Sequence, residues 1–111
     1  MSWPWRFLPQ AGLDLEDIAD HFLEVEAGDP RLADRFNAAI EDALRRLGTQ
    51  PRAGPEFGST KSALRGLRVW TIRGFPSHLV LYVIRKDRIE VVRVVHGSMD
   101  LRRRSGSGPG A

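Results

Sequence analysis

The chain has 111 residues, which is the ordinary size of a single domain. With 41% hydrophobic and 28% charged residues it can bury a core in water, and no apolar run approaches the roughly 18 to 20 residues of a membrane-spanning helix. The chain has no cysteine, which excludes a disulfide framework, and its first ten residues lack the basic and apolar regions of a secretory signal. We expect a cytoplasmic protein.

The net charge of +3 is distributed unevenly along the chain. Residues 1–56 carry six arginines against eleven acidic residues, whereas residues 57–111 carry nine arginines and two lysines against three acidic residues. Guanidinium groups bind phosphate and carboxylate in a bidentate manner, so the basic half suits an anionic partner, either nucleic acid or an acidic protein. A solvated surface without a partner is the alternative.

The first two predicted elements are a strand and a helix. Residues 3–9 alternate aromatic and apolar side chains, and a proline in this run favours an edge strand or a strand start. Apolar residues then recur at three- and four-residue steps from Leu15 to Val25, which predicts an amphipathic helix. Asp14 is its candidate N-cap, although the helix could begin as early as Pro9, and it ends near Gly28.

A second helix follows after a very short connection. Asp29 is a candidate N-cap and Pro30 suits the first helical position. An apolar stripe runs from Ala33 to Leu47, and Gly48 and Pro51 stop the helix. The two helices therefore form an antiparallel hairpin, whose shared apolar stripe needs a sheet to cover it.

The second half of the chain predicts a sheet. Residues 51–61 are rich in turn-forming types and should form an exposed loop. Three segments rich in β-branched and aromatic residues follow, Leu67–Arg73, His78–Arg85 and Ile89–Val95, and short connections make them an antiparallel meander. The middle segment is apolar on both alternating faces, which predicts a central strand covered on both sides.

The domain organisation follows from these elements. We expect a single domain over residues 1–101. Residues 102–111 have no apolar side chain before the final alanine and predict a disordered tail.

Two segments resemble the RelE/ParE toxin superfamily of type II toxin–antitoxin systems, and its ParE-like branch most closely. They are LRGLRVWTIRGFPSHLVLYV (Leu64–Val83), with its Arg-Gly-Phe-Pro turn and its apolar strand containing Tyr, and IEVVRVVHGSMDL (Ile89–Leu101), with Arg-Val-x-His-Gly. The resemblance implies an α+β fold: an N-terminal strand, an antiparallel helical hairpin, a three-stranded antiparallel meander and a short C-terminal helix. It also implies a toxin of the plasmid-stabilisation type that a cognate antitoxin holds inactive in a hetero-oligomer.

The resemblance leaves two targets open. ParE-like members are associated with inhibition of DNA gyrase, whereas RelE-like members cleave mRNA on the ribosome. A nuclease would use His96 as acid or base, but the following GSMDLRRR holds no tyrosine, glutamate or second histidine to assist it. We therefore favour a gyrase inhibitor that is not an enzyme. The alternatives are a ribosome-dependent mRNA endonuclease, with Arg65, Arg73 and Arg93 as phosphate clamps, and a non-toxic member kept as a co-repressor.

Arginines of the basic half are the candidate target-binding residues. They are Arg65, Arg68, Arg73, Arg85 and Arg93. The structural alternative is that they form salt bridges with acidic residues of the helices, for instance Asp17, Glu24 or Glu41.

The antitoxin is predicted to bind the helical hairpin. We expect an acidic-tailed antitoxin whose C-terminal amphipathic helix folds into the groove of the hairpin and which adds a strand at the sheet edge. The predicted antitoxin-binding residues are Phe22, Val25, Phe36 and Ile40.

The remaining aromatic residues, histidines and glycines predict neither a metal site nor a cofactor site. Tyr82 and Trp70 lie in apolar strand segments, which favours core positions. His21, His78 and His96 are scattered along the sequence without a metal-binding spacing. No glycine-rich loop of phosphate-binding spacing is present.

Overall fold

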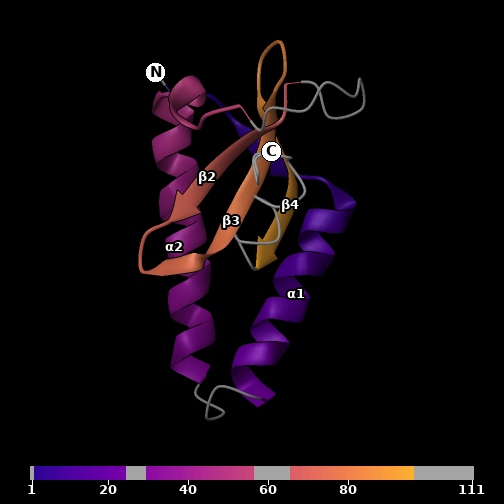
Figure 1. Ribbon diagram of the computed structural model, residues 1–111, viewed down its shortest axis with the longest axis vertical. Coiled ribbons are helices and arrows are strands. Elements are labelled where there is room, and N and C mark those ends of the chain that lie inside the picture. The colour runs from indigo at the N-terminus through magenta and orange to yellow at the C-terminus, as the bar shows by residue number, and fades with distance from the viewer. Residues whose placement is uncertain (1, 25–29, 57–65, 97–111) are drawn as a thin grey trace, which may run out of the picture.

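A computed structural model describes residues 2–24, 30–56 and 66–96 (Figure 1). The chain forms an α+β fold in which two helices pack on one face of a four-stranded sheet. Its elements are β1 (Trp5–Phe7), α1 (Pro9–Glu24), α2 (Pro30–Thr49), the short 3-10 helix η1 (Pro51–Ala53), β2 (Arg68–Ile72), β3 (Phe75–Ile84) and β4 (Ile89–His96). The predicted fold class is confirmed, while the predicted C-terminal helix and the tail lie outside the described residues.

Helix α1 begins at Pro9, the earlier of the two expected starts. Proline suits the first position of a helix because the backbone N–H that it lacks would have no partner there. Asp14 is therefore inside the helix, and its predicted role as the N-cap is wrong. Among the described residues, neither helix is long and apolar enough to cross a membrane.

The core lies between the helices and the inner face of the sheet. Phe36, Ile40, Leu44 and Leu47 recur at three- and four-residue steps along α2, and all four side chains are buried. They belong to one apolar cluster with Val80, Tyr82 and Val91 of the strands and with Phe22 of α1. The stripe predicted from the sequence is thus the face that joins the hairpin to the sheet.

The strands lie in the order β1-β4-β3-β2. β1 is an edge strand, as predicted, and pairs in parallel with β4, whereas β2, β3 and β4 form the predicted antiparallel meander. β3 is central, and residues of both its faces are buried, including Leu79 and Leu81 on one face and Val80 on the other. The prediction for the middle strand is therefore confirmed.

β3 begins at Phe75, three residues before the predicted start. Ile72 pairs with Phe75 and Thr71 pairs with Leu79, so the residues between Phe75 and Leu79 fall in a register shift. Pro76 lies in this shift, where its missing N–H costs no ladder hydrogen bond with β2. The sequence prediction took the proline as part of a loop and therefore placed the strand start too late.

The segment after α2 is anchored to the sheet. Tyr82 is fully buried; its hydroxyl donates to the Pro51 carbonyl (2.7 Å) and accepts from the Gly54 N–H (3.0 Å). Gly54 is buried too, and a Cβ there would lie 2.5 Å from the Val69 carbonyl oxygen. The prediction of a core tyrosine is confirmed. The prediction of an exposed loop is wrong for Gly54, because the tyrosine hydroxyl supplies a buried partner for its backbone.

Candidate functional site

The predicted target-binding arginines do not form a single open edge. Arg65 lies outside the described residues. The Arg68 side chain is only 15% exposed, and its Nη1 donates to the carbonyl oxygens of Gly54 (2.6 Å) and Arg52 (3.2 Å). Arg68 therefore holds the segment after α2 against β2, and little of its side chain is exposed to a partner.

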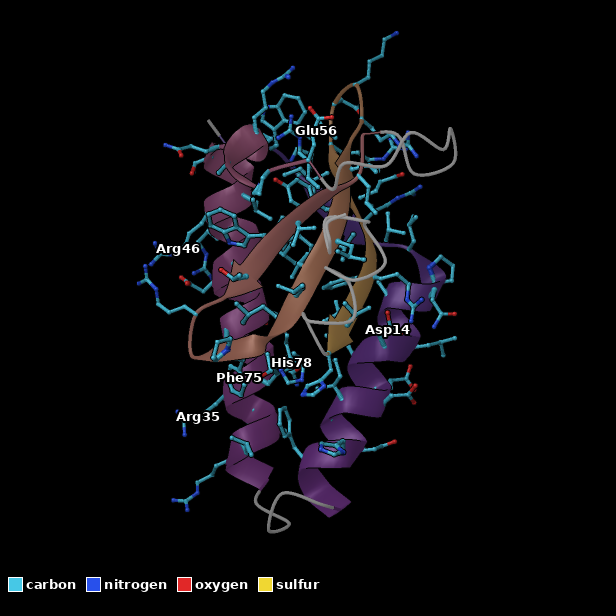
Figure 2. All side chains as sticks on the ribbon, viewed as in Figure 1. Asp14, Arg35, Arg46, Glu56, Phe75 and His78 are labelled. Atoms are coloured by element: carbon cyan, nitrogen blue, oxygen red, sulfur yellow. The ribbon has the colours of Figure 1, made fainter. Side chains whose placement is uncertain are left out.

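Arg93 is held by Asp14 of α1 (Figure 2). Its Nε and Nη2 donate to the two carboxylate oxygens at 2.7 and 3.1 Å, and the buried Val94 N–H donates to the same carboxylate at 2.9 Å. Burial alone would raise the pKa of Asp14, but the hydrogen bonds from Arg93, Val94 and Gln10 outweigh it and lower that pKa. The pair joins α1 to β4, so for Arg93 the structural alternative holds, with Asp14 in place of the acids suggested from the sequence.

Arg85 belongs to a cluster that the sequence prediction did not identify. Arg85, Arg88 and Arg6 donate to the Glu90 carboxylate at 3.0, 3.1 and 2.9 Å. The hydrogen bond from Arg85, followed by those from Arg88 and Arg6, lowers the pKa of Glu90 to about 2. The Glu90 side chain is 6% exposed, whereas Arg6 and Arg85 are 59% and 55% exposed. The Glu90 carboxylate thus holds three arginine side chains in place, and the exposed parts of their guanidinium groups can contact a partner.

Arg73 lies in the turn between β2 and β3 and is exposed. Its charge acts on Asp42 of α2, whose pKa is lowered by the hydrogen bond from Arg46 and, more weakly, by the charges of Arg73 and Arg45. Arg73 thus lies near enough to α2 for its charge to act on Asp42, whereas Arg93 and His96 lie on β4. Arg93 and His96 both reach α1, where Arg93 binds Asp14 and His96 lines a cavity with Asp17 and His21.

The fold gathers the three histidines, which the sequence prediction treated as scattered. His21, His78 and His96 line one cavity of about 240 Å³ together with Asp17 and Ile18, and we call it the histidine cavity. His78 and His96 pair across β3 and β4, with ring centroids 4.8 Å apart, and His21 comes from α1. The spacing of the three histidines in the sequence does not predict this cluster, because the cluster depends on the register of β3 with β4 and on the packing of α1 against β4.

His78 is the buried member of the cavity. Its ring contacts the rings of Phe22, Phe36 and Phe75 (Figure 2), and burial, with the nearby His96 and His21, lowers its pKa to about 4. The His78 ring is therefore neutral at pH 7. His96, unlike His78, is exposed. Within the described ranges, no group of three or more His, Asp or Glu side chains is placed to hold a metal ion.

Three predicted antitoxin-binding residues are buried in the chain's own core. Phe22, Phe36 and Ile40 are 5%, 1% and 2% exposed, and Val25 lies outside the described residues. Among the described residues, the large apolar side chains that are exposed are Leu13 on α1 and Trp5 on the edge strand β1. The role of these positions in antitoxin binding stays a prediction.

Comparisons with known proteins agree on the fold. The toxin–antitoxin structure described as the chromosomal ParDE system from P. aeruginosa matches with a TM-score of 0.69 at 19% identity, covering 86% of this chain and 97% of that one. The RelBE2 toxin–antitoxin complex from Mycobacterium tuberculosis matches with a TM-score of 0.57 at 24% identity, covering 86% and 99%. No curated protein matches the chain. The sequence model of the family described as ParE toxin of type II toxin–antitoxin system, parDE, matches residues 5–101, and the chain therefore belongs to the ParE toxin family.

Proposed function

We propose that this chain is the toxin of a type II toxin–antitoxin module and that it acts by binding and inhibiting DNA gyrase, without bond-making chemistry of its own. Its membership of the ParE toxin family supports the first part. The observation that supports the second part is that the described lining of the cavity around His96 contains no arginine or lysine. A gyrase inhibitor of this kind works in the cytoplasm, where its target lies.

Cleavage of RNA without a metal needs cations that stabilise the charge developing on the phosphate, placed beside the acid or base. Arg93 binds Asp14, and Arg73 lies in the turn between β2 and β3, where its charge acts on Asp42 of α2. The described lining of the histidine cavity includes the carboxylate of Asp17 but no arginine or lysine, so a phosphate there would meet like charge. The arrangement favours an interaction function over a ribosome-dependent mRNA endonuclease.

The exposed arginines are the proposed contacts with the target. Arg85 fits best, because its guanidinium is exposed and oriented by Glu90, and oriented side chains lose less freedom when they bind. Arg73 is the second candidate because of its exposed position in the turn. Arg65 keeps its predicted role, whereas the roles of Arg68 and Arg93 in target binding are indirect, through the segments that they hold in place.

The proposed neutralising partner is a cognate antitoxin that forms a hetero-oligomer with this chain. Two of the structures that share this fold are described as toxin–antitoxin assemblies. An amphipathic antitoxin helix would lie along the outer surface of the hairpin, supported from beneath by Phe22, Phe36 and Ile40. Leu13 is the exposed apolar side chain that such a helix would cover.

The test is to express the chain in bacterial cells and to record which response comes first, DNA-damage signalling or arrest of translation. We expect DNA-damage signalling first, with intact mRNA, and we expect the His96→Ala variant to arrest growth as the parent chain does. Co-expression of the neighbouring antitoxin gene should restore growth. Early mRNA cleavage that disappears in His96→Ala would replace the gyrase proposal with the nuclease.

A further inference from the structure

Figure 1 shows the end of the molecule where α2 ends and the β3–β4 hairpin turns back. A cleft lined by both apolar and charged side chains lies there. It consists of two cavities of about 450 and 480 Å³, which share Trp3, Arg52 and Ile84 in their linings. We call the pair the η1 cleft, because residues of η1 line both halves. Each half has the size of an ordinary small-molecule site.

The two halves differ in chemistry. The smaller one is lined by apolar surface from Trp3, Pro51 and Ile84. The larger one adds Arg68, Arg85 and Lys86 to the shared Arg52, with Glu56 as the one acidic side chain in its described lining (Figure 2 labels Glu56 at this end). An apolar slot therefore opens directly into a cationic one.

The positive charge of the larger half is only partly neutralised by the protein. Glu56 lies 3.9 Å from the Arg68 guanidinium and is itself 67% exposed, and Arg85 shares Glu90 with two other arginines. Arg52 and Lys86 are exposed, and no carboxylate among the described residues pairs with either of them. Two exposed cations that line one cavity, one after α2 and one in the β3–β4 hairpin, are suited to an anionic ligand.

We propose that the η1 cleft binds a short segment of single-stranded nucleic acid, with one base in the apolar half against Trp3 and the flanking phosphates on Arg52, Lys86 and Arg85. Single strands alternate planar apolar bases with anionic phosphates, and proteins bind them by aromatic stacking beside a cationic groove. A duplex keeps its bases stacked and offers none to the apolar half. The inference does not rest on the proposed gyrase target, because its test uses the purified chain without gyrase.

The test measures binding of a fluorescently labelled eight-residue oligothymidylate to the purified full chain by anisotropy, over a series of salt concentrations. We expect the Arg52→Ala/Lys86→Ala double variant to lose about tenfold or more in affinity and its salt slope to become shallower by roughly 0.7 for each lost phosphate contact. The matched control is Arg35→Glu, which removes the same net charge at an exposed position near the far end of α2 (Figure 2). Arg102, Arg103 and Arg104 are present in every variant and contribute equally.

The base in the apolar half is tested without changing the protein, since Trp3 also packs against the core and its replacement could disturb the fold. An abasic oligomer with the same number of phosphates should bind the unaltered chain about tenfold more weakly, as expected for the loss of a stacked base. Equal binding of the abasic oligomer, or an equal loss of affinity in Arg35→Glu, overturns the proposal. So does tighter binding of a duplex or of an oligoglutamate peptide than of the oligothymidylate.

Discussion

Two regions of this molecule use arginine in opposite ways. Between α1 and β4, the Arg93 guanidinium and the Val94 N–H both bind the nearly buried Asp14 carboxylate, so the charges there are paired and join a helix to the sheet. At the η1 cleft, Arg52 and Lys86 are exposed and have no acidic partner among the described residues. An arginine-rich sequence therefore does not by itself define a binding surface, because the fold pairs some of its cations with internal carboxylates.

The largest expected effect is at the paired region. Asp14→Ala removes the acceptor of a buried N–H and of a bidentate guanidinium, and we expect it to lower the free energy of unfolding by about 3 kcal/mol. Urea denaturation of the parent and variant chains measures this. Asp14→Asn, which can still accept from Val94, should lose less. If Asp14→Ala is as stable as the parent chain, the pair does not hold α1 to β4.

The next effect is a dependence of stability on pH that arises at His78. Its folded pKa of about 4 lies below the ordinary value of 6.5, so the unfolded chain takes up a proton at higher pH than the folded chain. Stability is therefore fully present above about pH 6.5 and falls as the pH drops towards 4, by up to about 3 kcal/mol. Asp14 and Glu90 have lowered pKa values and lose their contributions mainly at lower pH.

Chemical denaturation at a series of pH values between 7 and 4 checks the role of His78. A His78→Leu variant, which fits the apolar contacts with Phe22 and Phe36, should flatten the profile in this window. His21→Gln is the matched control, since His21 lines the same cavity from the exposed side and its loss should leave most of the slope in place. An unchanged slope in His78→Leu would assign the dependence to another group.

A smaller effect concerns the wall of the η1 cleft. Tyr82→Phe leaves the ring in the core but removes the hydroxyl that bonds the Pro51 carbonyl and the buried Gly54 N–H. We expect a loss of about 1 to 2 kcal/mol in the free energy of unfolding. Hydrogen exchange should show faster exchange of the Gly54 amide, with little change in α1. Protection of that amide equal to the parent's would mean that the tyrosine does not anchor the segment.

The smallest change in stability is predicted for an exposed arginine with a proposed contact role. Arg85→Ala should alter the free energy of unfolding by no more than about 0.5 kcal/mol, because exposed ion pairs contribute little, yet it should weaken gyrase inhibition. Arg93→Ala is the comparison and should cost about 1 to 2 kcal/mol through its contact with Asp14. If Arg85→Ala and Arg93→Ala lowered the free energy of unfolding equally, the distinction between an exposed contact arginine and an internally paired one would be wrong.

The local patterns that predicted the fold correctly are those that depend on near neighbours. The apolar stripe from Phe36 to Leu47 and the doubly apolar run of β3 each follow from a repeat of a few residues, so the sequence alone predicts the helix and the central strand. The start of β3 was missed because Pro76 marks a turn unless a register shift with β2 makes room for it. Such a register shift depends on how β3 pairs with β2, which the sequence around Pro76 does not show.

The candidate sites were less predictable because they depend on partners far apart in the chain. Arg93 and Asp14 are separated by 79 positions, and nothing in the sequence of either segment reveals the pairing. The histidine cavity arises from the register of β3 with β4 and from the packing of α1. Likewise, the sequence prediction did not identify Arg52 or Lys86, since a binding role for either becomes apparent only when the end of α2 and the β3–β4 hairpin form one cleft.

The most direct test of the central claim uses purified gyrase, relaxed plasmid DNA and the purified chain. A binding inhibitor should stop supercoiling and cause cleaved, gyrase-linked DNA to accumulate, equally with the parent chain and with His96→Ala, and less with Arg85→Ala. The same concentration of the chain should be tested on translating ribosomes. The account would be contradicted if the chain cleaved mRNA and arrested translation there but neither stopped supercoiling nor caused cleaved DNA to accumulate.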